Sequence, residues 1–347
     1  MKPFEYRNFD YSGWKRPAHE IIKDAQLKSE LYNKGYSVIP GFISDTEVAE
    51  LKNSYTQNHT INVADGGLFV SIYSKNLDYR NQIHNKILET TGKKFETIFQ
   101  NYKFTCLSYI VKYPGKKGEL FVHQDMAQVD EFNHSQVGIW LPLQDVNLEN
   151  GTMGILPYSH FTIPPHRTLY HQLPFSKIYP TAFKYLQPVK LKAGDLLLFD
   201  IRLLHNSFIN TSNEPRIVIG SSAVAADAPF CICYRDKESK SETAENEYEL
   251  IEVSDNFYLD FKDFKSEKIL RPEGKTGKKI LIKERFVEED EFIDFCEKHK
   301  IEAHDNTSFI NTEQTKSIQE PDYSEEPVLS SAIANKKTFF ERFKQLF

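Results

Sequence analysis

Length, composition and charge limit what this chain can be. With 347 residues, 40% of them hydrophobic, the chain can bury a full core, and its length suggests one large domain or two small ones. The formal net charge of -6 and the pI near 6.0 argue against a generic nucleic-acid binder, for which a basic surface is expected.

The cysteines and the apolar runs bear on location. Four cysteines are few for a disulfide scaffold, and none lies in a Cys-x-x-Cys pair, so reduced thiols are expected. Cys231 and Cys233 alternate along a predicted strand, which favours packing over metal binding. Residues 1–6 contain no apolar secretion core, and no run of about eighteen apolar residues occurs. We therefore expect a cytoplasmic protein without a transmembrane span.

Residues 1–102 are predicted to form an N-terminal arm and a set of buttressing helices. Apolar residues at roughly helical spacing between 21 and 32 predict a helix that Gly35 ends, followed by a short strand over 35–42. Ser44 and Glu47 form a capping box that opens a second helix. The apolar spacing from 76 to 99 predicts one or two further helices, in which His84 is a surface or packing residue.

From residue 103 the hydrophobic period changes from helical to alternating. Residues 103–112 alternate between two faces and are rich in β-branched and aromatic side chains, which predicts a strand. Further strands are predicted at 137–143, 151–156, 189–192, 196–199 and 217–223, spaced as in a barrel or sandwich. Residues 161–183 interrupt this rhythm and are interpreted as an insertion over the mouth of the barrel. The core is thus expected to span 103–235.

The C-terminal part is expected to form three segments. A charged extension over 236–305 contains strands and a short helix near 291–299, and a polar, flexible linker follows over 306–335. Residues 336–347 place aromatic side chains on one helical face with basic residues around the rest. This terminal helix can pack on its own domain, dock on a partner, or lie on an anionic membrane surface.

Three residues in the core carry the pattern of a metal site. His123 and Asp125 are two positions apart, so on an extended strand their side chains point to the same side. His205 follows the apolar run 196–199. Two imidazoles and one carboxylate on one face of a metal leave three positions open, the arrangement that non-haem Fe(II) oxygenases use. A closed four-ligand structural site could not perform that chemistry.

Arg216 lies where it can return to this site. It follows His205 by eleven residues, and the polar segment 210–215 can form a turn that brings it back on the neighbouring antiparallel strand. A guanidinium fork binds a carboxylate bidentately in a dry site.

With these residues, positions 103–224 resemble the double-stranded β-helix core of the phytanoyl-CoA dioxygenase-like family of Fe(II)/2-oxoglutarate oxygenases. Three blocks carry the resemblance: Val122-His123-Gln124-Asp125; then Trp140-Leu141-Pro142-Leu143, Asn150-Gly151 and Leu156-Pro157-Tyr158-Ser159-His160; then Ala193-Gly194-Asp195, His205-Asn206-Ser207 and Arg216. The resemblance implies a mainly β fold with flanking helices (α+β) and a jelly-roll, cupin-like core. Tyr158 stands where the family usually has glycine, which predicts a different local turn if that glycine has positive φ.

The resemblance also implies cofactors and roles. His123, Asp125 and His205 would hold Fe(II), which would bind 2-oxoglutarate and O2. Arg216 would anchor the distal carboxylate of 2-oxoglutarate, Ser207 would donate a further hydrogen bond, and Trp140 would line the cosubstrate site. The expected products are succinate, CO2 and a substrate hydroxylated at an unactivated C–H bond. Halogenating relatives have a small residue in place of Asp125, so hydroxylation, desaturation or ring closure is preferred here.

The substrate is expected to be a small molecule or a carrier-bound group, and the sequence does not identify it. Candidate contacts in the insertion are His166, Arg167, Tyr170 and His171, since insertions on a rigid scaffold often carry specificity. Two other readings stay open at this point. One is a cupin-type metal enzyme that is not an oxygenase. The other is a catalytically silent β-helix domain that acts as a binding or scaffold module.

Overall fold

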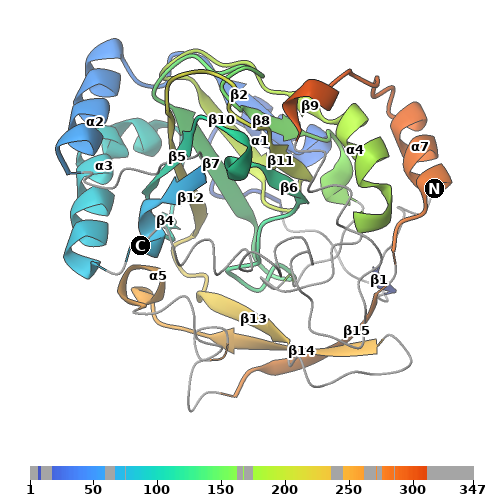
Figure 1. Cartoon of the computed structure of the whole chain (residues 1–347). Coiled ribbons are helices and arrows are strands. Elements are labelled where there is room, and N and C mark those ends of the chain that lie inside the picture. Colours follow the sequence, from blue (N-terminus) through green and yellow to red (C-terminus); the bar gives the residue numbers. More distant parts are fainter. Residues whose placement is uncertain are drawn as a thin grey trace.

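Figure 1 shows the fold of the protein in a computed structural model. The structure describes residues 7–8, 18–58, 67–74, 76–161, 167, 175–235, 245–261, 271, 276–284 and 286–310. The terminal helix expected over 336–347, most of the expected linker, and three candidate substrate contacts, His166, Tyr170 and His171, lie outside these residues.

The first helix begins later than its apolar spacing suggested. α1 (Ala25–Lys34) starts after Asp24, whose carboxylate accepts from the Leu27 amide, and ends at Gly35, which takes the left-handed φ of 89° as expected. Ile21 and Ile22 precede the helix and are buried, and Ile22 forms a β-bridge with Phe99. Their spacing therefore reflects burial against α3 (Leu77–Ile98) rather than helix. β2 (Tyr36–Ile39) follows.

The capping box predicted at Ser44 is confirmed at the start of α2 (Asp45–Asn58). The Glu47 carboxylate accepts from the Ser44 amide at 2.7 Å, and the Glu47 amide donates to the Ser44 hydroxyl at 3.3 Å. α3 is a single long helix, and inside it His84 Nδ1 accepts a hydrogen bond from the Leu107 amide at 3.0 Å. His84 is thus a packing residue, and burial lowers its pKa.

The larger sheet has the strand order β2-β10-β7-β12-β5-β3, with β4 also paired to β12. Its remaining strands are β3 (Gly67–Val70), β4 (Tyr102–Phe104), β5 (Ser108–Tyr113), β7 (Gln136–Pro142), β10 (Leu196–Asp200) and β12 (Arg216–Ala225). The strand expected over 103–112 is divided into β4 and β5. Three residues, 105–107, lie opposite only two on β12, Ser221 and Ser222, so the extra residue forms a bulge.

The smaller sheet has the order β6-β11-β8-β9 and consists of β6 (Leu120–His123), β8 (Met153–Ile155), β9 (Gln187–Pro188) and β11 (His205–Ser207). The strand expected over 189–192 differs, because Leu191 makes only an isolated bridge to Val146 and the regular pairing lies at β9. Tyr158, just after β8, takes the left-handed φ of 68° itself, so the turn is not changed in the way the missing glycine predicted. Its amide donates to the Lys34 carbonyl at 2.9 Å.

The two sheets enclose an apolar cluster, and helices cover the outer face of the larger one. Alternate residues of the larger sheet, such as Trp140, Leu197 and Val218, pack with Ile155 and Met153 of the smaller sheet. The residues between them pack against the helices α2 and α3, which lie side by side along one flank (Figure 1). The fold is therefore a double-stranded β-helix with flanking helices, as expected.

A third sheet of order β1-β15-β14-β13, at the bottom of Figure 1, combines two strands of the expected C-terminal extension with β13 from the end of the expected core and β1 from the N-terminal arm. Its strands are β1 (Arg7–Asn8), β13 (Cys231–Arg235), β14 (Glu245–Glu252) and β15 (Lys278–Glu284). Cys231 and Cys233 are buried here as free thiols that pack with Tyr248 and Leu250, as predicted. The pairing of β1 with β15 joins the N-terminal arm to the extension.

Short helices complete the structure: α4 (Tyr179–Tyr185), α5 (Phe257–Asp260), α7 (Glu289–Lys298) and the 3-10 turns η1 (Ser71–Tyr73), η2 (Lys116–Gly118), η3 (Ser159–Phe161), η4 (Ser176–Ile178) and η5 (Thr307–Phe309). The packed chain extends into the segment expected as linker, because the buried Asn306 amide donates to the Phe183 and Leu186 carbonyls. Among the described helices, none has the length and apolarity needed to cross a membrane.

Candidate active site

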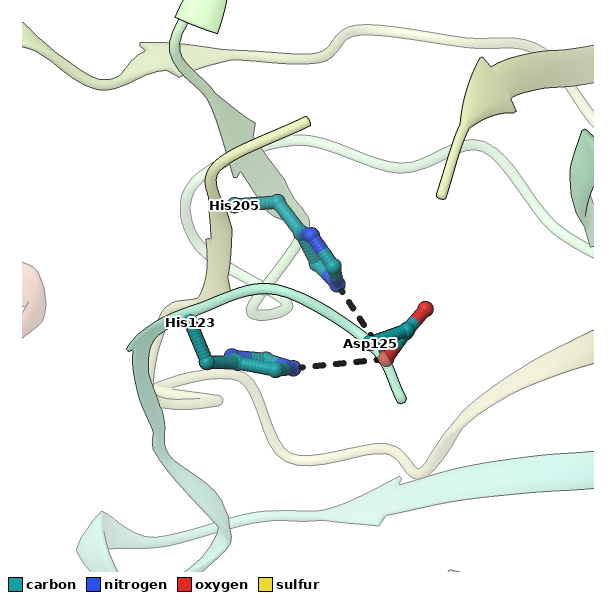
Figure 2. A group of neighbouring side chains, drawn as sticks. All are labelled: His123, Asp125 and His205. Carbon is teal, nitrogen blue, oxygen red and sulfur yellow. Dashed lines mark ion pairs between the residues drawn. The ribbon is translucent and has the colours of Figure 1, made fainter. Parts of the chain in front are cut away.

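The three predicted metal ligands meet on the smaller sheet. His123 ends β6 and pairs in register with His205, the first residue of β11, while Asp125 follows β6 by two residues. Both imidazole Nε2 atoms lie 3.7 Å from the Asp125 Oδ1 atom, and the ring centroids are 4.3 Å apart (Figure 2). Antiparallel pairing thus brings together two histidines that are 82 positions apart in the chain.

Backbone carbonyls fix the orientation of both imidazoles. His123 Nδ1 lies 2.6 Å from the Phe121 carbonyl oxygen, and His205 Nδ1 lies 2.8 Å from the Leu203 carbonyl oxygen. A carbonyl oxygen can only accept, so each Nδ1 carries the proton and donates it. Each Nε2 is then left with a free lone pair directed at Asp125 (Figure 2), which is the tautomer that a metal requires.

The electrostatics of His205 and Asp125 also favour the protonation states that bind metal. Burial, assisted by the neighbouring His123, lowers the pKa of His205 to about 4, although Asp125 opposes the shift. Burial alone would raise the pKa of Asp125, but His205 and His123 outweigh it and the net pKa lies below the usual value. At neutral pH the site therefore presents a neutral His205 and an ionised Asp125.

These donors fit a single divalent ion. The three ligand atoms lie within 4.8 Å of one another, close enough for one ion with bonds of about 2.0–2.2 Å after small side-chain movements. The side chain of Asp125 is 39% exposed and that of His123 is 25% exposed, so both ligands are accessible to solvent. Two imidazoles and one carboxylate with open positions are the donor set of non-haem Fe(II) centres.

Arg216 is a buried cation that has no anionic partner among the residues that the structure describes. It begins β12, is 1% exposed, and donates from Nη1 to the Gly151 carbonyl at 2.5 Å and to the Ser207 hydroxyl at 3.3 Å. Its buried Nε has no hydrogen-bond partner, and within the described ranges no carboxylate pairs with the guanidinium. Burial lowers the Arg216 pKa to about 9. Trp140 lies beside it, with the guanidinium carbon 5.3 Å from the ring centroid.

Sequence reasoning missed a second buried cation, Lys112. The register of β5 and β12 places Lys112 opposite Arg216, on the same face of the sheet. Its ammonium donates to the Ser207 carbonyl at 3.0 Å and to the Phe208 carbonyl. Burial, followed by the nearby Arg216, lowers its pKa well below the usual value. The signal in the sequence was a lysine at an inward position of an otherwise apolar alternating strand.

Arg167, a candidate substrate contact, lies at the back of Asp125 instead of on a solvated loop. The side chain is fully buried and forms an ion pair with Glu131. Its Nε also donates to the Asp125 carbonyl at 2.8 Å. Nothing in the sequence pattern connected Glu131 with this site.

Gln124, the residue between His123 and Asp125, links these two ligands to the loop that precedes His205. Its side-chain amide donates to the Arg202 carbonyl, and Arg202 is fixed by a 2.7 Å ion pair with Asp200. Phe199 packs against the His205 ring at a centroid distance of 5.4 Å. The ring of Phe199 occupies the space that a side chain at Gly138 would need.

The architecture and the residues around His205 define a class: double-stranded β-helix proteins with a candidate His-x-Asp…His metal centre. A family model described as phytanoyl-CoA dioxygenase (PhyH) matches residues 31–218, more than half of the chain, and the chain belongs to this family. The matched region includes all three candidate ligands and Arg216.

Individual relatives match only part of the chain. The chain is similar to Phytanoyl-CoA dioxygenase 1 of Oryza sativa subsp. japonica, at 33% identity over 31% of the chain and 40% of the relative. It is also similar to Phytanoyl-CoA dioxygenase of Arabidopsis thaliana, at 32% identity over 34% of the chain and 43% of the relative. The matches thus span less than half the length of these curated relatives. Among solved structures, SnoK, a non-heme alpha ketoglutarate dependent carbocyclase from nogalamycin biosynthesis, shares 20% identity over 60% of this chain and 86% of its own, with a TM-score of 0.43.

Proposed function

We propose that this protein is an Fe(II)- and 2-oxoglutarate-dependent dioxygenase that hydroxylates an unactivated C–H bond. Membership of the phytanoyl-CoA dioxygenase family supports the reaction class. The observation that carries the cosubstrate is the buried guanidinium of Arg216, which has an unsatisfied Nε and no carboxylate partner in the described part of the chain. A buried, uncompensated charge is costly, so a bound anion is needed to offset it.

The spacing along β11 suits the length of 2-oxoglutarate. His205 and Ser207 are two residues apart, so their side chains point to the same side about 6.6–6.8 Å apart along the strand. Ser207 accepts from Arg216, so a five-carbon dicarboxylate could reach from the candidate ligands to the guanidinium. Arg216 would bind the distal carboxylate, Ser207 would donate to it, and Trp140 would pack alongside. Lys112 would support this site by donating to the Ser207 and Phe208 carbonyls.

His123, Asp125 and His205 would hold the iron, with their Nδ1 and carbonyl contacts keeping the imidazoles oriented. Bound Fe(II) with 2-oxoglutarate and O2 would supply the oxidising power, with succinate and CO2 as coproducts. Halogenating enzymes have a small residue in place of Asp125, which leaves a metal coordination position for halide. The carboxylate of Asp125 therefore favours hydroxylation, desaturation or ring closure.

The proposed substrate is a small molecule or a carrier-bound group. His166 and Tyr170 remain proposed contacts for it, while the Arg167 guanidinium is already engaged with Glu131. We place the reaction in the cytoplasm, because all four cysteines are buried free thiols, as expected for a reducing compartment.

The test is anaerobic titration of the metal-free protein with Fe(II) and then with 2-oxoglutarate. The expected result is a weak visible charge-transfer band, which arises only when 2-oxoglutarate chelates the iron. His205→Ala should lose the band and succinate formation. Arg216→Ala should keep metal binding but require much more 2-oxoglutarate. Ser44→Ala, which alters a distant helix cap, serves as the control and should titrate like the wild type.

Two outcomes would replace the proposal. Folded protein that binds the metal but shows no band with 2-oxoglutarate would indicate a cupin-type enzyme of another class. Folded protein that binds neither would indicate a catalytically silent domain with a binding or scaffold role.

A further inference from the structure

A buried ion pair lies directly behind the candidate metal ligands. Arg167 is 0% exposed and Glu131 is 2% exposed. The pair is bidentate, with Nη1 2.6 Å from Glu131 Oε2 and Nη2 3.0 Å from Glu131 Oε1. Both partners lie outside the regular strands, so the pair joins two loops that are 36 residues apart in the chain.

The same arginine also holds the backbone on both sides of Met126. Its Nε donates to the Asp125 carbonyl at 2.8 Å, and its own carbonyl accepts from the Ala127 amide at 3.2 Å. The guanidinium thus uses at least three of its five N–H groups on Glu131 and Asp125. This geometry fixes a short backbone segment and leaves few donors for a substrate.

Asp125 needs such support more than the other two ligands do. His123 and His205 belong to paired strands of the smaller sheet, and their imidazoles are fixed by carbonyl contacts. Asp125 lies after the end of β6, in a stretch without ladder hydrogen bonds that continues to β7. Ligand precision of about 0.5 Å has to come from supporting contacts when the secondary structure does not provide it.

We propose that Arg167, held by Glu131, is a positioning residue that sets the Asp125 carboxylate for metal binding. The inference rests on the proposed function, since it assumes that Asp125 binds a metal. A buried ion pair contributes little net stability compared with well-packed apolar side chains of similar volume. The role of the Arg167–Glu131 pair is therefore to fix the backbone that carries Asp125, and its net contribution to stability is small.

The distinction can be measured because the charges can be removed together. The double variant Arg167→Met/Glu131→Leu removes both charges of this ion pair together, so it should fold with an unfolding midpoint near that of the wild type. Its Mn(II) dissociation constant, measured by the loss of the free Mn(II) signal in electron paramagnetic resonance, should rise about 10- to 100-fold. The visible spectrum of bound Co(II), which reports ligand geometry, should change as well.

A matched control is available in the C-terminal sheet. Arg271 and Glu249 form a two-point ion pair at 3.0 and 3.2 Å, in which Glu249 lies on β14 and is 9% exposed and Arg271 is 40% exposed. Arg271→Met/Glu249→Leu removes the same charges away from the candidate ligands and should leave Mn(II) affinity and the Co(II) spectrum unchanged.

The outcomes separate this inference from the proposed function. A folded Arg167→Met/Glu131→Leu variant with wild-type Mn(II) affinity would overturn the positioning role while leaving the metal site intact. A wild-type protein that binds no Mn(II) or Fe(II) would overturn both. If the double variant does not fold, Arg167→Lys decides the matter, because lysine can pair with Glu131 but lacks the fork needed to reach the Asp125 carbonyl at the same time. Weakened Mn(II) binding by folded Arg167→Lys supports the role, and unchanged binding refutes it.

Discussion

Replacing Arg216 with methionine should stabilise the ligand-free protein and remove most of its response to 2-oxoglutarate. Burial lowers the pKa of Arg216 from its usual value to about 9, and at about 1.36 kcal/mol per pKa unit this corresponds to a penalty of about 5 kcal/mol for the buried charge. The two hydrogen bonds from Nη1, to Gly151 and Ser207, return about 1.5–2 kcal/mol each. The net gain for Arg216→Met is about 1–2 kcal/mol, or about 1–3 °C in the unfolding midpoint of a chain this long.

The response to cosubstrate should change in the opposite direction. In the wild type with Mn(II), 2-oxoglutarate at about 100 times its dissociation constant should add about 2.7 kcal/mol of stability. Loss of the paired guanidinium costs about 2–5 kcal/mol of binding, so at the same concentration the variant should keep less than about 1 kcal/mol of this shift.

The assay is thermal unfolding of both proteins in three conditions: metal-free, with Mn(II), and with Mn(II) plus 2-oxoglutarate. Mn(II) should shift both proteins equally, because Arg216 makes no contact with the candidate ligands. An Arg216→Met protein that is less stable than the wild type when ligand-free, yet retains the 2-oxoglutarate shift, would show that Arg216 is a structural residue. The inference that the buried Arg216 charge requires a bound carboxylate would then be wrong.

Three further predictions follow from single contacts. In the metal-free protein, His205 binds a proton below about pH 6.5 when the chain is unfolded but only below about pH 4 when it is folded. The free energy of unfolding should therefore fall by up to about 3 kcal/mol as the pH drops from about 6.5 to about 4. In urea unfolding, His205→Gln should lose about 3 kcal/mol less stability between pH 7 and pH 4 than the wild type loses. An equal loss in both proteins would contradict the assignment of this pH dependence to His205. Gly138→Ala places a Cβ 2.3 Å from the Phe199 ring, which packs on His205. The substitution should lower the stability of the fold by about 1–3 kcal/mol and weaken Mn(II) binding. Unchanged Mn(II) affinity would show that displacement of the Phe199 ring does not move His205. Ser44→Ala should lower stability by about 1 kcal/mol through the lost helix cap, as measured by urea unfolding, and metal titration should show unchanged Mn(II) affinity. A stability loss below about 0.3 kcal/mol would argue against the cap.

Local patterns predicted much of the fold because they depend on near neighbours. The capping box at Ser44 and the stop at Gly35 are made by residues three or four positions apart, and both lie where the sequence placed them. The alternation of β7 and β12 follows from one face packing on helices and the other facing the smaller sheet. The His-x-Asp spacing and the later histidine likewise pointed to a shared site.

Predictions failed where long-range packing outweighed the local pattern. Ile21 and Ile22 have helical spacing but lie before α1, since a bridge to Phe99 buries them. The bulge between β4 and β5 depends on the partner strand β12, which a single strand's alternation does not reveal. Tyr158 takes a left-handed conformation that few non-glycine residues adopt, held by a contact to Lys34 in a distant segment.

The sequence by itself determined which residue types could bind metal and carboxylate, because ligand chemistry belongs to the side chain. Only the tertiary structure decided how they are supported. It brought Lys112 beside Arg216 through strand register, left that arginine without a carboxylate among the described residues, and turned Arg167 from a candidate substrate contact into the partner of Glu131 behind Asp125. These relations join segments tens of residues apart, and a pattern read along one chain contains no distances across space.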